Sequence, residues 1–409
     1  MAVTWRGIGI TGLVAGALVA ATTGSPTLAR RYINTVKVHP LSTWVFNTPT
    51  AFYAANLDYG ANSRQAGITR HLVATFNVDD GGGEYEVHDP REPDFRYRQI
   101  AKPLRSFLLR DVHVHVPSAT PIIHGVSPND GRTVGLTAGD GGYSVTVPVR
   151  DLFRRRHEQA PSGFTWISIP RSTNYFHWFS ETLPMLIRGV QCCEEDNLPQ
   201  SAFIDPGGLP TWAHHSLQPL NVPIWAPDKA VVECPSVMLI GCRTQFTLTA
   251  TDISLIRGCL LDTVDTIDQS HPTQIPPTPA GGIFVTRSSA TRSTAAMVAL
   301  EQALAHHGFL IVDTAKLTLK QQIALFASSH MIVAANGAGL LNAAWLPTGS
   351  TVVELQPTDY FDTGRIVLAR AAGHRYEYVD VRDLDSNDHG AIDALAAHIA
   401  GLLPRAPKQ

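Results

Sequence analysis

The sequence predicts an α/β protein built from two domains. Its 409 residues exceed what one hydrophobic core usually supports. From residue 164 onward, short apolar runs alternate with helix-length segments. Such alternation is typical of a parallel sheet with helices on both faces. A proline-rich stretch, residues 262–282, interrupts the alternation and indicates a linker between the two domains.

We therefore divide the chain into four parts. An apolar segment, residues 1–30, precedes an N-terminal domain, residues 31–261, which begins rich in glycine, proline and short β-like runs. The linker 262–282 leads to a C-terminal domain, residues 283–409, in which strands and helices alternate most regularly.

The first 30 residues combine Arg6, a nearly unbroken apolar run over residues 7–21, and a small-residue ending at residues 27–29. This pattern describes a signal peptide, because the run is short for a bilayer span of about 20 residues. A cleaved signal, a membrane anchor and a buried first helix all stay open. Membrane association, if it occurs, is expected through this segment.

Composition excludes several classes of protein. Hydrophobic residues make up 44% of the chain and charged residues 16%, with a net charge of −3, as in globular proteins. Nucleic-acid binding needs clustered Lys and Arg, so no nucleic-acid partner is expected. The five cysteines form no CxxC pair and are odd in number, which argues against a disulfide framework or a zinc site. Reduced thiols in a cytosolic protein are expected.

In the N-terminal domain, residues 108–118 and 142–149 alternate apolar and polar side chains with period two, as half-buried strands do. His113 and His115 would share one strand face. With no third ligand in view, we expect a solvent-facing or hydrogen-bonded pair rather than a metal site. Strands are then expected at 164–170, 201–206 and 222–225, and helices at 174–186, 212–220 and 250–261.

The C-terminal domain alternates five strands with helices, which predicts an open parallel sheet covered on both faces. The strands are expected at 283–287, 309–313, 331–335, 351–355 and 376–381, and the helices at 294–308, 318–330, 336–346, 365–373 and 391–403. Thr318 and Gln321 predict a capping box for the second helix. The third helix follows a glycine turn.

Ligands of parallel α/β sheets bind beyond the carboxyl ends of the strands. Arg287 ends the first strand and Arg292 follows it, residues 336–342 form the glycine turn, and Glu354 lies near the end of the fourth strand. Cations and unpaired backbone N–H groups suit phosphates, and a carboxylate suits ribose hydroxyls. Together they predict a nucleoside diphosphate site, although each alone is explained by a salt bridge or an ordinary connector.

Other ligand motifs fit less well. The C-terminal domain has neither GxGxxG after its first strand nor a P-loop GxxxxGK[ST]. Asp383 and Asp385 formally match the DxD pair of metal-dependent sugar transfer. They precede the last helix, however, where an aspartate N-cap is expected. No metal site is predicted.

The helix over residues 174–186, NYFHWFSETLPML, is mostly apolar yet carries an imidazole and a carboxylate. Residues i and i+4 share a helix face, so His177 and Glu181 should touch. A carboxylate that orients an imidazole favours its charged form and makes it a base near neutral pH. The structural alternative is a partly buried histidine hydrogen-bonded for stability. Pro184 should kink or weaken this helix.

The motif YFHWFSETLPML resembles the HWxxExLPxL signature of glycosyltransferase family 61. That family includes bacterial capsular-polysaccharide proteins and eukaryotic xylosyl-, arabinosyl- and N-acetylglucosaminyltransferases. Residues 283–357 agree in order, with a strand ending in arginine, a Gly-Phe strand, a QI-xx-F helix, a GAGLxN turn and an ExxP strand end. Asn336 stands where the family commonly has His, and Ala295 or Ala296 where an asparagine often follows the second arginine.

The resemblance implies a GT-B-like enzyme in which two Rossmann-like domains face a cleft, the N-terminal one on the acceptor side. It implies an inverting transferase without metal or other cofactor, which moves sugar from a nucleotide-sugar, by expectation a UDP-sugar, to a glycan or polysaccharide hydroxyl. A bacterial host would place it in the cytoplasm or at the inner membrane. The implied catalytic residues are His177 and Glu181. The implied donor-binding residues are Arg287, Arg292, Asn336, Gly337, Ala338, Gly339, Leu340, Asn342 and Glu354.

Two alternatives to catalysis stay open. One is a glycosyltransferase-like protein that binds nucleotide-sugars without turnover, because Asn336 cannot act as an acid or base. The other is a cytosolic nucleotide-binding regulator without sugar chemistry.

Overall fold

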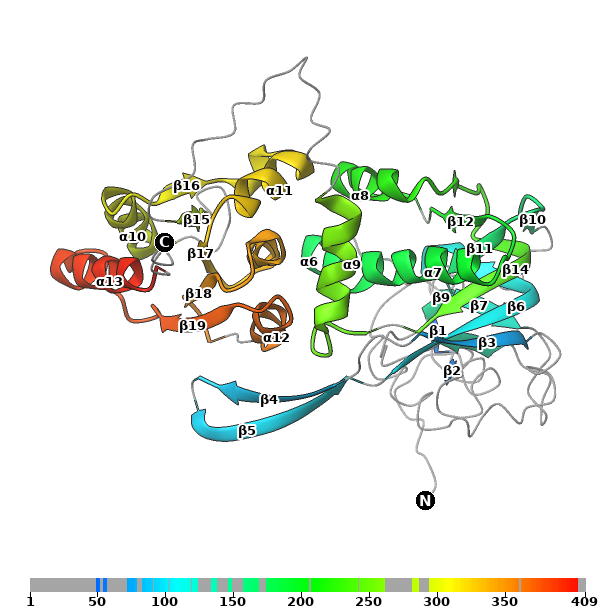
Figure 1. Cartoon of the computed structure of the whole chain (residues 1–409), viewed down its shortest axis with the longest axis horizontal. Coiled ribbons are helices and arrows are strands. Elements are labelled where there is room, and N and C mark those ends of the chain that lie inside the picture. The colour runs from blue at the N-terminus through cyan, green and yellow to red at the C-terminus, as the bar shows by residue number, and fades with distance from the viewer. Residues whose placement is uncertain are drawn as a thin grey trace, which may run out of the picture.

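The computed structural model has two lobes that lie side by side (Figure 1). We call the described residues up to 261 the N-terminal lobe and those from 282 the C-terminal lobe. The structure describes residues 49–51, 54–56, 72–78, 83–90, 92–101, 103–118, 120–123, 134–137, 146–148, 157–168, 174–205, 207–241, 243–261, 282–286, 294–359 and 362–403. The apolar segment 1–30, most of the linker, Arg287 and Arg292 lie outside the described residues.

Four parallel strands form the centre of the N-terminal lobe, in the order β13-β12-β11-β14. They are β11 (Thr165–Ser168), β12 (Ser201–Ile204), β13 (Ile224–Trp225) and β14 (Val231–Ile240). The first three are the predicted strands. This order is that of one half of a doubly wound sheet, whose direction reverses between β11 and β14.

A mainly antiparallel extension widens the same sheet beyond β14, in the order β6-β7-β8-β2, with β3 also antiparallel on β6. The pair β8–β2 is parallel, and β10 pairs with β14 in parallel. Its strands are β6 (Leu104–His115), β7 (Thr120–Ile123), β8 (Val134–Thr137), β2 (Ala54–Asn56), β3 (Leu72–Val78) and β10 (Glu158–Gln159). Two separate pairs complete the lobe, β1 (Pro49–Ala51) with β9 (Thr146–Pro148), and β4 (Gly83–Asp89) with β5 (Glu92–Ala101). The strand predicted at 108–118 is β6, which ends in the short helix η2 (Val116–Ser118).

The predicted helix over residues 174–186 contains a π-helical turn. It consists of α6 (Tyr175–His177), the π-turn η3 (Trp178–Thr182) and α7 (Leu183–Glu195). Pro184 has no N–H for the carbonyl four residues earlier, and Leu183 N–H instead donates to the Trp178 carbonyl. The expected irregularity near Pro184 is confirmed. The remaining helices of the lobe are α8 (Thr211–Leu217), η4 (Gln218–Leu220) and α9 (Ala250–Leu260).

The C-terminal lobe confirms the predicted open parallel sheet. Its order is β16-β15-β17-β18-β19, so the direction of winding reverses between β15 and β17. The strands are β15 (Ile283–Val285), β16 (Leu310–Val312), β17 (Met331–Ala335), β18 (Thr351–Gln356) and β19 (Arg375–Asp380). Ligands of such sheets bind at the carboxyl ends of the strands beside this reversal.

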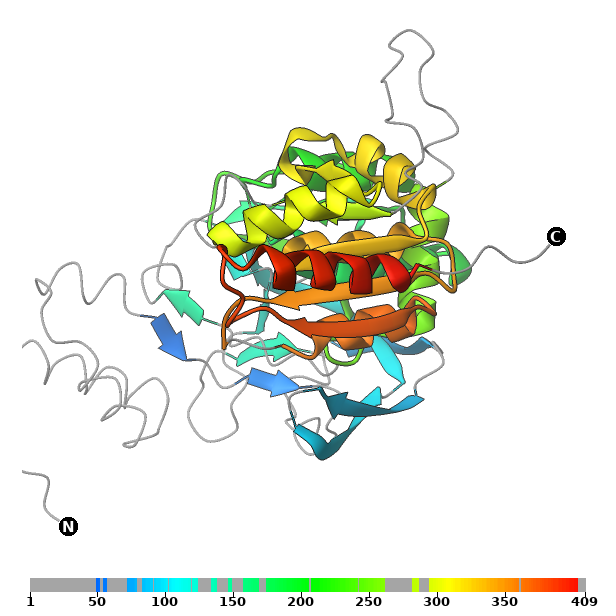
Figure 2. The same cartoon turned by 90° about the vertical axis from the view of Figure 1, so that its left-hand side faces the viewer.

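Helices cover both faces of this sheet. On the outer face, α10 (Ala295–His306) and α13 (His389–Gly401) pack over one core cluster, as Figure 2 shows in front of the strands. The inner face carries α11 (Leu319–Ala327), η6 (Ala338–Trp345) and α12 (Gly364–Ala371), with η5 (Thr314–Lys316) before α11. Thr318 and Gln321 form the predicted capping box of α11.

The two lobes share one apolar core on that inner side. A single buried cluster includes Phe176, Phe179 and Ile256 from the N-terminal lobe together with Phe326 and Trp345 from the C-terminal lobe. Helix α6 packs against η6, α9 against α12, and α8 against α11. The lobes are therefore in close contact over much of their facing surfaces.

Two sequence predictions about elements were wrong, and one strand was missed. The segment after Gly337 is a 3-10 helix rather than an α-helix, and carbonyls at its end contact Arg257 and His374 from other elements. Strand β14 was not predicted, since Pro235 and Glu233 interrupt its apolar pattern. The last helix is capped by Asp388, whose side chain accepts from Ala391 N–H, and not by Asp383 or Asp385.

In the part of the chain that the structure describes, every helix is too short or too polar to cross a bilayer.

Candidate functional site

His177 lies just beyond the carboxyl end of β11, at the reversal point of the N-terminal sheet. Asn174 starts the helix there, its side-chain oxygen accepting from Phe176 N–H at 2.9 Å. Phe176 and Trp178 are almost fully buried, whereas 37% of the His177 side chain is exposed. The aromatic neighbours therefore anchor the helix in the core and leave the imidazole at its surface.

Glu181 lies beneath this imidazole, and the predicted contact is present. His177 Nδ1 is 3.1 Å from Glu181 Oε1, and the carboxylate is 3% exposed. Glu181 Oε1 also accepts from the backbone N–H of Gln245, at 2.7 Å. The hydrogen bond to Glu181 raises the pKa of His177, although desolvation and Arg365 oppose the shift. Nδ1 is thus turned inward, which leaves Nε2 as the outward nitrogen.

Charged groups of the C-terminal lobe meet this pair. Arg365, in α12, places its guanidinium 4.3 Å from the centre of the Phe176 ring, next to His177 in the chain. Its Nη1 donates to Asp362 Oδ2 at 2.6 Å, and Gln245 Nε2 donates to the same oxygen at 3.2 Å. Because Arg365 and Asp362 both act on His177 electrostatically, the two lobes converge at the imidazole.

The sequence did not single out Gln245, Asp362 or Arg365. Gln245 lies in the connection between β14 and α9, and Arg365 begins the helix predicted at 365–373, to which no site residue was assigned. Asp362 and Arg365 could have been found by their position, because they follow the carboxyl end of β18, where ligands of parallel sheets bind.

Asn336 and Glu354 are bonded to each other inside the C-terminal lobe. Asn336 Nδ2 donates to Glu354 Oε1 at 2.5 Å, and Tyr376 Oη donates to Oε2 at 2.7 Å. Glu354 is fully buried, and burial raises its pKa while the bonds from Tyr376 and Asn336 oppose the shift. Asp362 and Arg365 also act on Glu354 electrostatically, as they do on His177. The proposed contact of Glu354 with a ribose stays a prediction.

The glycine turn crosses the end of β15. Gly337 has φ 154° and ψ −173°, a backbone region that is essentially restricted to glycine. A Cβ on Gly339 would lie 3.1 Å from Val285 Cγ1. These two glycines therefore allow the chain to pass closely over β15, at the reversal point of the C-terminal sheet. Leu340, predicted with them, is fully buried in the core.

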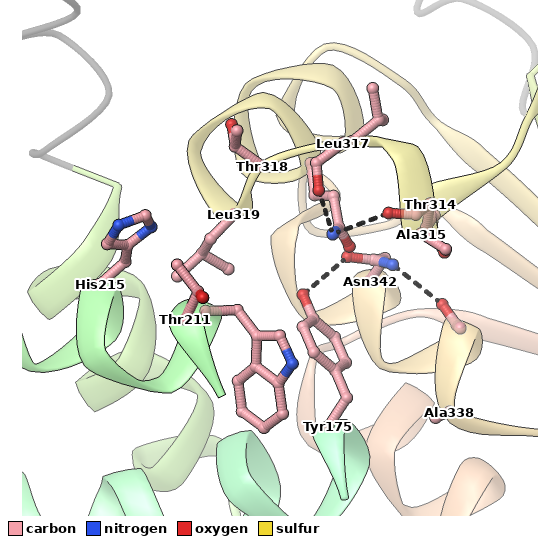
Figure 3. Close-up of a pocket in the computed structure, with 13 residues that line it drawn as sticks. Tyr175, Thr211, His215, Thr314, Ala315, Leu317, Thr318, Leu319, Ala338 and Asn342 are labelled. Atoms are coloured by element: carbon pink, nitrogen blue, oxygen red, sulfur yellow. Dashed lines mark hydrogen bonds between the residues drawn. The ribbon is translucent and has the colours of Figure 1, made fainter. Parts of the chain in front are cut away.

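A cavity of about 330 Å³ lies between the lobes beside this turn (Figure 3). Tyr175 Oη donates across it to Asn342 Oδ1 at 3.4 Å, and Asn342 Nδ2 donates to the Gly339 carbonyl at 3.2 Å. Gln322 Nε2 donates to the carbonyls of Thr314 and Leu317. The residues that line the cavity come from both lobes: Tyr175, Thr211, Trp212, His215, Thr314, Ala315, Leu317, Thr318, Leu319, Gln322, Ala338, Gly339 and Asn342.

The structure thus divides the predicted site residues between two neighbouring sites, the cavity and the charged group around His177. Ala338, Gly339 and Asn342 line the cavity, while His177 does not, although Tyr175 two residues earlier does. His177 and Glu181 instead face the group around Arg365. Helix α6 joins the two places, because its successive residues contribute to both.

One prediction about metal ligands was incomplete. His115 is buried, but His113 has two potential co-ligands beside it, His157 and Glu233, which are distant in the sequence. This group lies on the N-terminal sheet.

Residues 175–353 match the sequence model of the family Glycosyltransferase 61. The match begins at Tyr175, includes His177, Glu181 and the glycine turn, and ends before Glu354. It supports a glycosyltransferase, an enzyme that uses a sugar donor and an acceptor. A comparison with curated proteins finds no match.

Proposed function

We propose, on the premise of the Glycosyltransferase 61 match, that the chain transfers a sugar with inversion from a nucleotide-sugar to a hydroxyl of a glycan or polysaccharide. One observation carries the proposal. A partly exposed imidazole, held by a buried carboxylate, lies on α6, which follows β11 and packs against η6, the element that follows β17. A nucleotide-sugar donor favours a cytoplasmic reaction.

His177 acts as the general base. Glu181 holds Nδ1, so Nε2 takes the proton of the acceptor hydroxyl as its oxygen bonds to the anomeric carbon. The bond from that carbon to the donor phosphate breaks on the opposite face, and the electron pair leaves with the nucleoside diphosphate. The transition state resembles an oxocarbenium ion, as at other glycosidic centres.

Negative charge develops on the leaving diphosphate near the carboxyl ends of β15 and β17. The N–H groups at the start of η6 lie there. Arg287 and Arg292, which are predicted to bind phosphate, follow β15 in the sequence. Fixed donors and cations at the point where negative charge develops lower the barrier. In this scheme they supply what a divalent cation supplies in other sugar transferases.

The cavity beside Asn342 takes the nucleoside of the donor. Its volume of about 330 Å³ is at the lower end of the range for small-molecule sites. Tyr175 and Trp212 offer aromatic surface for a base, and Asn342 and Thr314 offer polar groups for orientation. The glycine turn on its wall then leads from the nucleoside toward the diphosphate.

Binding without turnover is the alternative that one observation favours. Asn336, where family members commonly carry His, is bonded to Glu354 and has no acid–base chemistry. A pseudo-enzyme would bind nucleotide-sugars but neither transfer nor hydrolyse them. Calorimetry with nucleotide-sugars followed by a transfer assay separates the two.

The first test identifies the donor and then removes the base. The right nucleotide-sugar raises the thermal stability of the protein, because it binds the folded state. With that donor, His177→Ala should lower kcat about 10²–10⁴-fold, as expected for loss of a general base, while the donor-induced thermal shift persists. Transfer by the wild type should continue with EDTA in the assay and no added Mg²⁺ or Mn²⁺.

His306→Ala, at an exposed position on the outer helix α10, is the matched control and should leave transfer unchanged. Wild-type activity in the His177→Ala protein would contradict the role of this imidazole. A requirement for added Mg²⁺ or Mn²⁺ would contradict the metal-free departure of the diphosphate.

A further inference from the structure

Three side chains with metal-ligating atoms converge on one face of the N-terminal sheet. Glu233 of β14 lies directly opposite His113 of β6 in the antiparallel register and opposite Gln159 of β10 in the parallel register. His157 directly precedes β10, and its ring lies beside the same carboxylate. Sheet pairing alone brings together residues that are up to 120 positions apart (113 to 233).

The distances fit a single bound ion. Glu233 Oε1 lies 3.4 Å from His113 Nε2 and 3.4 Å from His157 Nδ1. All three candidate ligand atoms lie within 4.8 Å of one another. In a tetrahedral site with bonds of about 2.0–2.1 Å, ligand atoms are separated by roughly 3.3–3.4 Å. An ion between these atoms would require little rearrangement.

A second contact orients the carboxylate. Gln159 Nε2 donates to Glu233 Oε2, the oxygen that does not face the histidines. Partners of this kind fix the orientation of a metal ligand. The side chains of His113, His157 and Glu233 are 25%, 18% and 41% exposed, so solvent reaches the group from one side.

We propose that His113, His157 and Glu233 bind Zn²⁺, with water as the fourth ligand. Two imidazole nitrogens and one carboxylate oxygen form a donor set that suits zinc, with one position left open. The ion joins β6, the antiparallel extension, to β10 and β14, at the border of the parallel centre. It stabilises this junction of the lobe.

The test measures zinc binding to the full-length chain. The protein is freed of metal with EDTA, dialysed into EDTA-free buffer and titrated with ZnCl₂ by calorimetry. One equivalent should bind and should raise the melting temperature. His113→Gln and Glu233→Gln should each weaken binding by more than about tenfold, and Gln159→Leu by about 10–100-fold, as for other residues that orient metal ligands.

Three controls make the result decisive. The variant His306→Gln, which replaces an exposed histidine on α10, should bind zinc as the wild type does. Circular dichroism of the metal-free variants must match the wild type, and a variant that does not fold is replaced by His157→Gln. Co²⁺ should give weak visible bands without an intense thiolate band, because no cysteine takes part.

Absence of zinc binding, or wild-type affinity in both His113→Gln and Glu233→Gln, would overturn this site. A thiolate band with Co²⁺ would do the same, since it would place the metal on cysteine.

This inference stands apart from the transferase proposal. Glu233→Gln should retain transfer at permissive temperature, with EDTA present, if the zinc site only stabilises the sheet. Zinc binding with no transfer, or transfer with no zinc binding, would refute one proposal and leave the other.

Discussion

At the scale of single residues, the pair His177 and Glu181 combines two requirements that usually conflict. In the proposed mechanism the imidazole needs access to the acceptor, while the carboxylate needs shielding from water to hold the imidazole firmly. The π-turn meets both, since Glu181 is 3% exposed and is also bonded to Gln245 N–H, whereas His177 is at the surface. In the proposed mechanism this arrangement gives Glu181 a positioning role.

The pH dependence of transfer tests that role. Glu181 raises the pKa of His177 above its ordinary value of about 6.5. A base must be neutral, so activity should fall as pH decreases through this raised pKa. Glu181→Gln removes the main cause of the shift, so the acidic limb of the kcat profile should move to lower pH while the maximal kcat decreases.

Glu194→Gln, at an exposed position near the end of α7, serves as the charge-matched control and should keep the wild-type profile. An unchanged acidic limb in Glu181→Gln would show that another group titrates in the profile.

At the scale of elements, η6 depends on neighbours for its carbonyl partners. Arg257 of α9 donates from Nε to the Ala344 carbonyl and from Nη2 to the Leu346 carbonyl, both at 2.6 Å. His374 Nε2 lies 2.9 Å from the Ala343 carbonyl. A helix end usually leaves its last carbonyls unpaired. Here an arginine from the other lobe satisfies them, so η6 and the glycine turn before it are held from outside.

Arg257→Ala should therefore destabilise the protein by about 2–4 kcal/mol, because two hydrogen bonds from a charged donor are lost in a partly buried place. Chemical denaturation at neutral pH measures this change. Arg257→Lys keeps the charge but cannot reach both carbonyls in the same fork geometry, so it should restore only part of the stability.

A stability of Arg257→Ala equal to that of the wild type would mean that water replaces the guanidinium at no cost. The anchoring of η6 by α9 would then be unimportant.

At the scale of the whole molecule, the lobes share a core as well as a site. Phe179, fully buried in the N-terminal lobe, lies edge-on to Trp345 of the C-terminal lobe, with ring centres 5.8 Å apart. The same cluster continues through both lobes. Because burial of apolar surface is the main favourable contribution to folding, the lobes should unfold together.

Phe179→Ala should lower the free energy of unfolding by about 3–5 kcal/mol, the usual cost of removing a buried phenylalanine ring. Calorimetry should show one transition in the wild type, at a lower temperature in the variant. Val298→Ala, at an exposed site on α10, should change little. Two separate transitions in the wild type would contradict a shared core.

Local patterns in the sequence determined much of this protein. The five strands of the C-terminal lobe, most of its helices and the capping box of Thr318 follow from periodicity and short-range hydrogen bonds, which neighbouring residues encode by themselves. The contact between His177 and Glu181 was predictable for the same reason, since four residues on a helix set its geometry.

Only the tertiary structure decided what meets at the site. Asp362 and Arg365 act on His177 from the other lobe, Gln245 bonds both Glu181 and Asp362, and β14 brings Glu233 to His113 by strand pairing. Such contacts join residues separated by tens to hundreds of positions. No local periodicity carries them, because they depend on how whole elements pack.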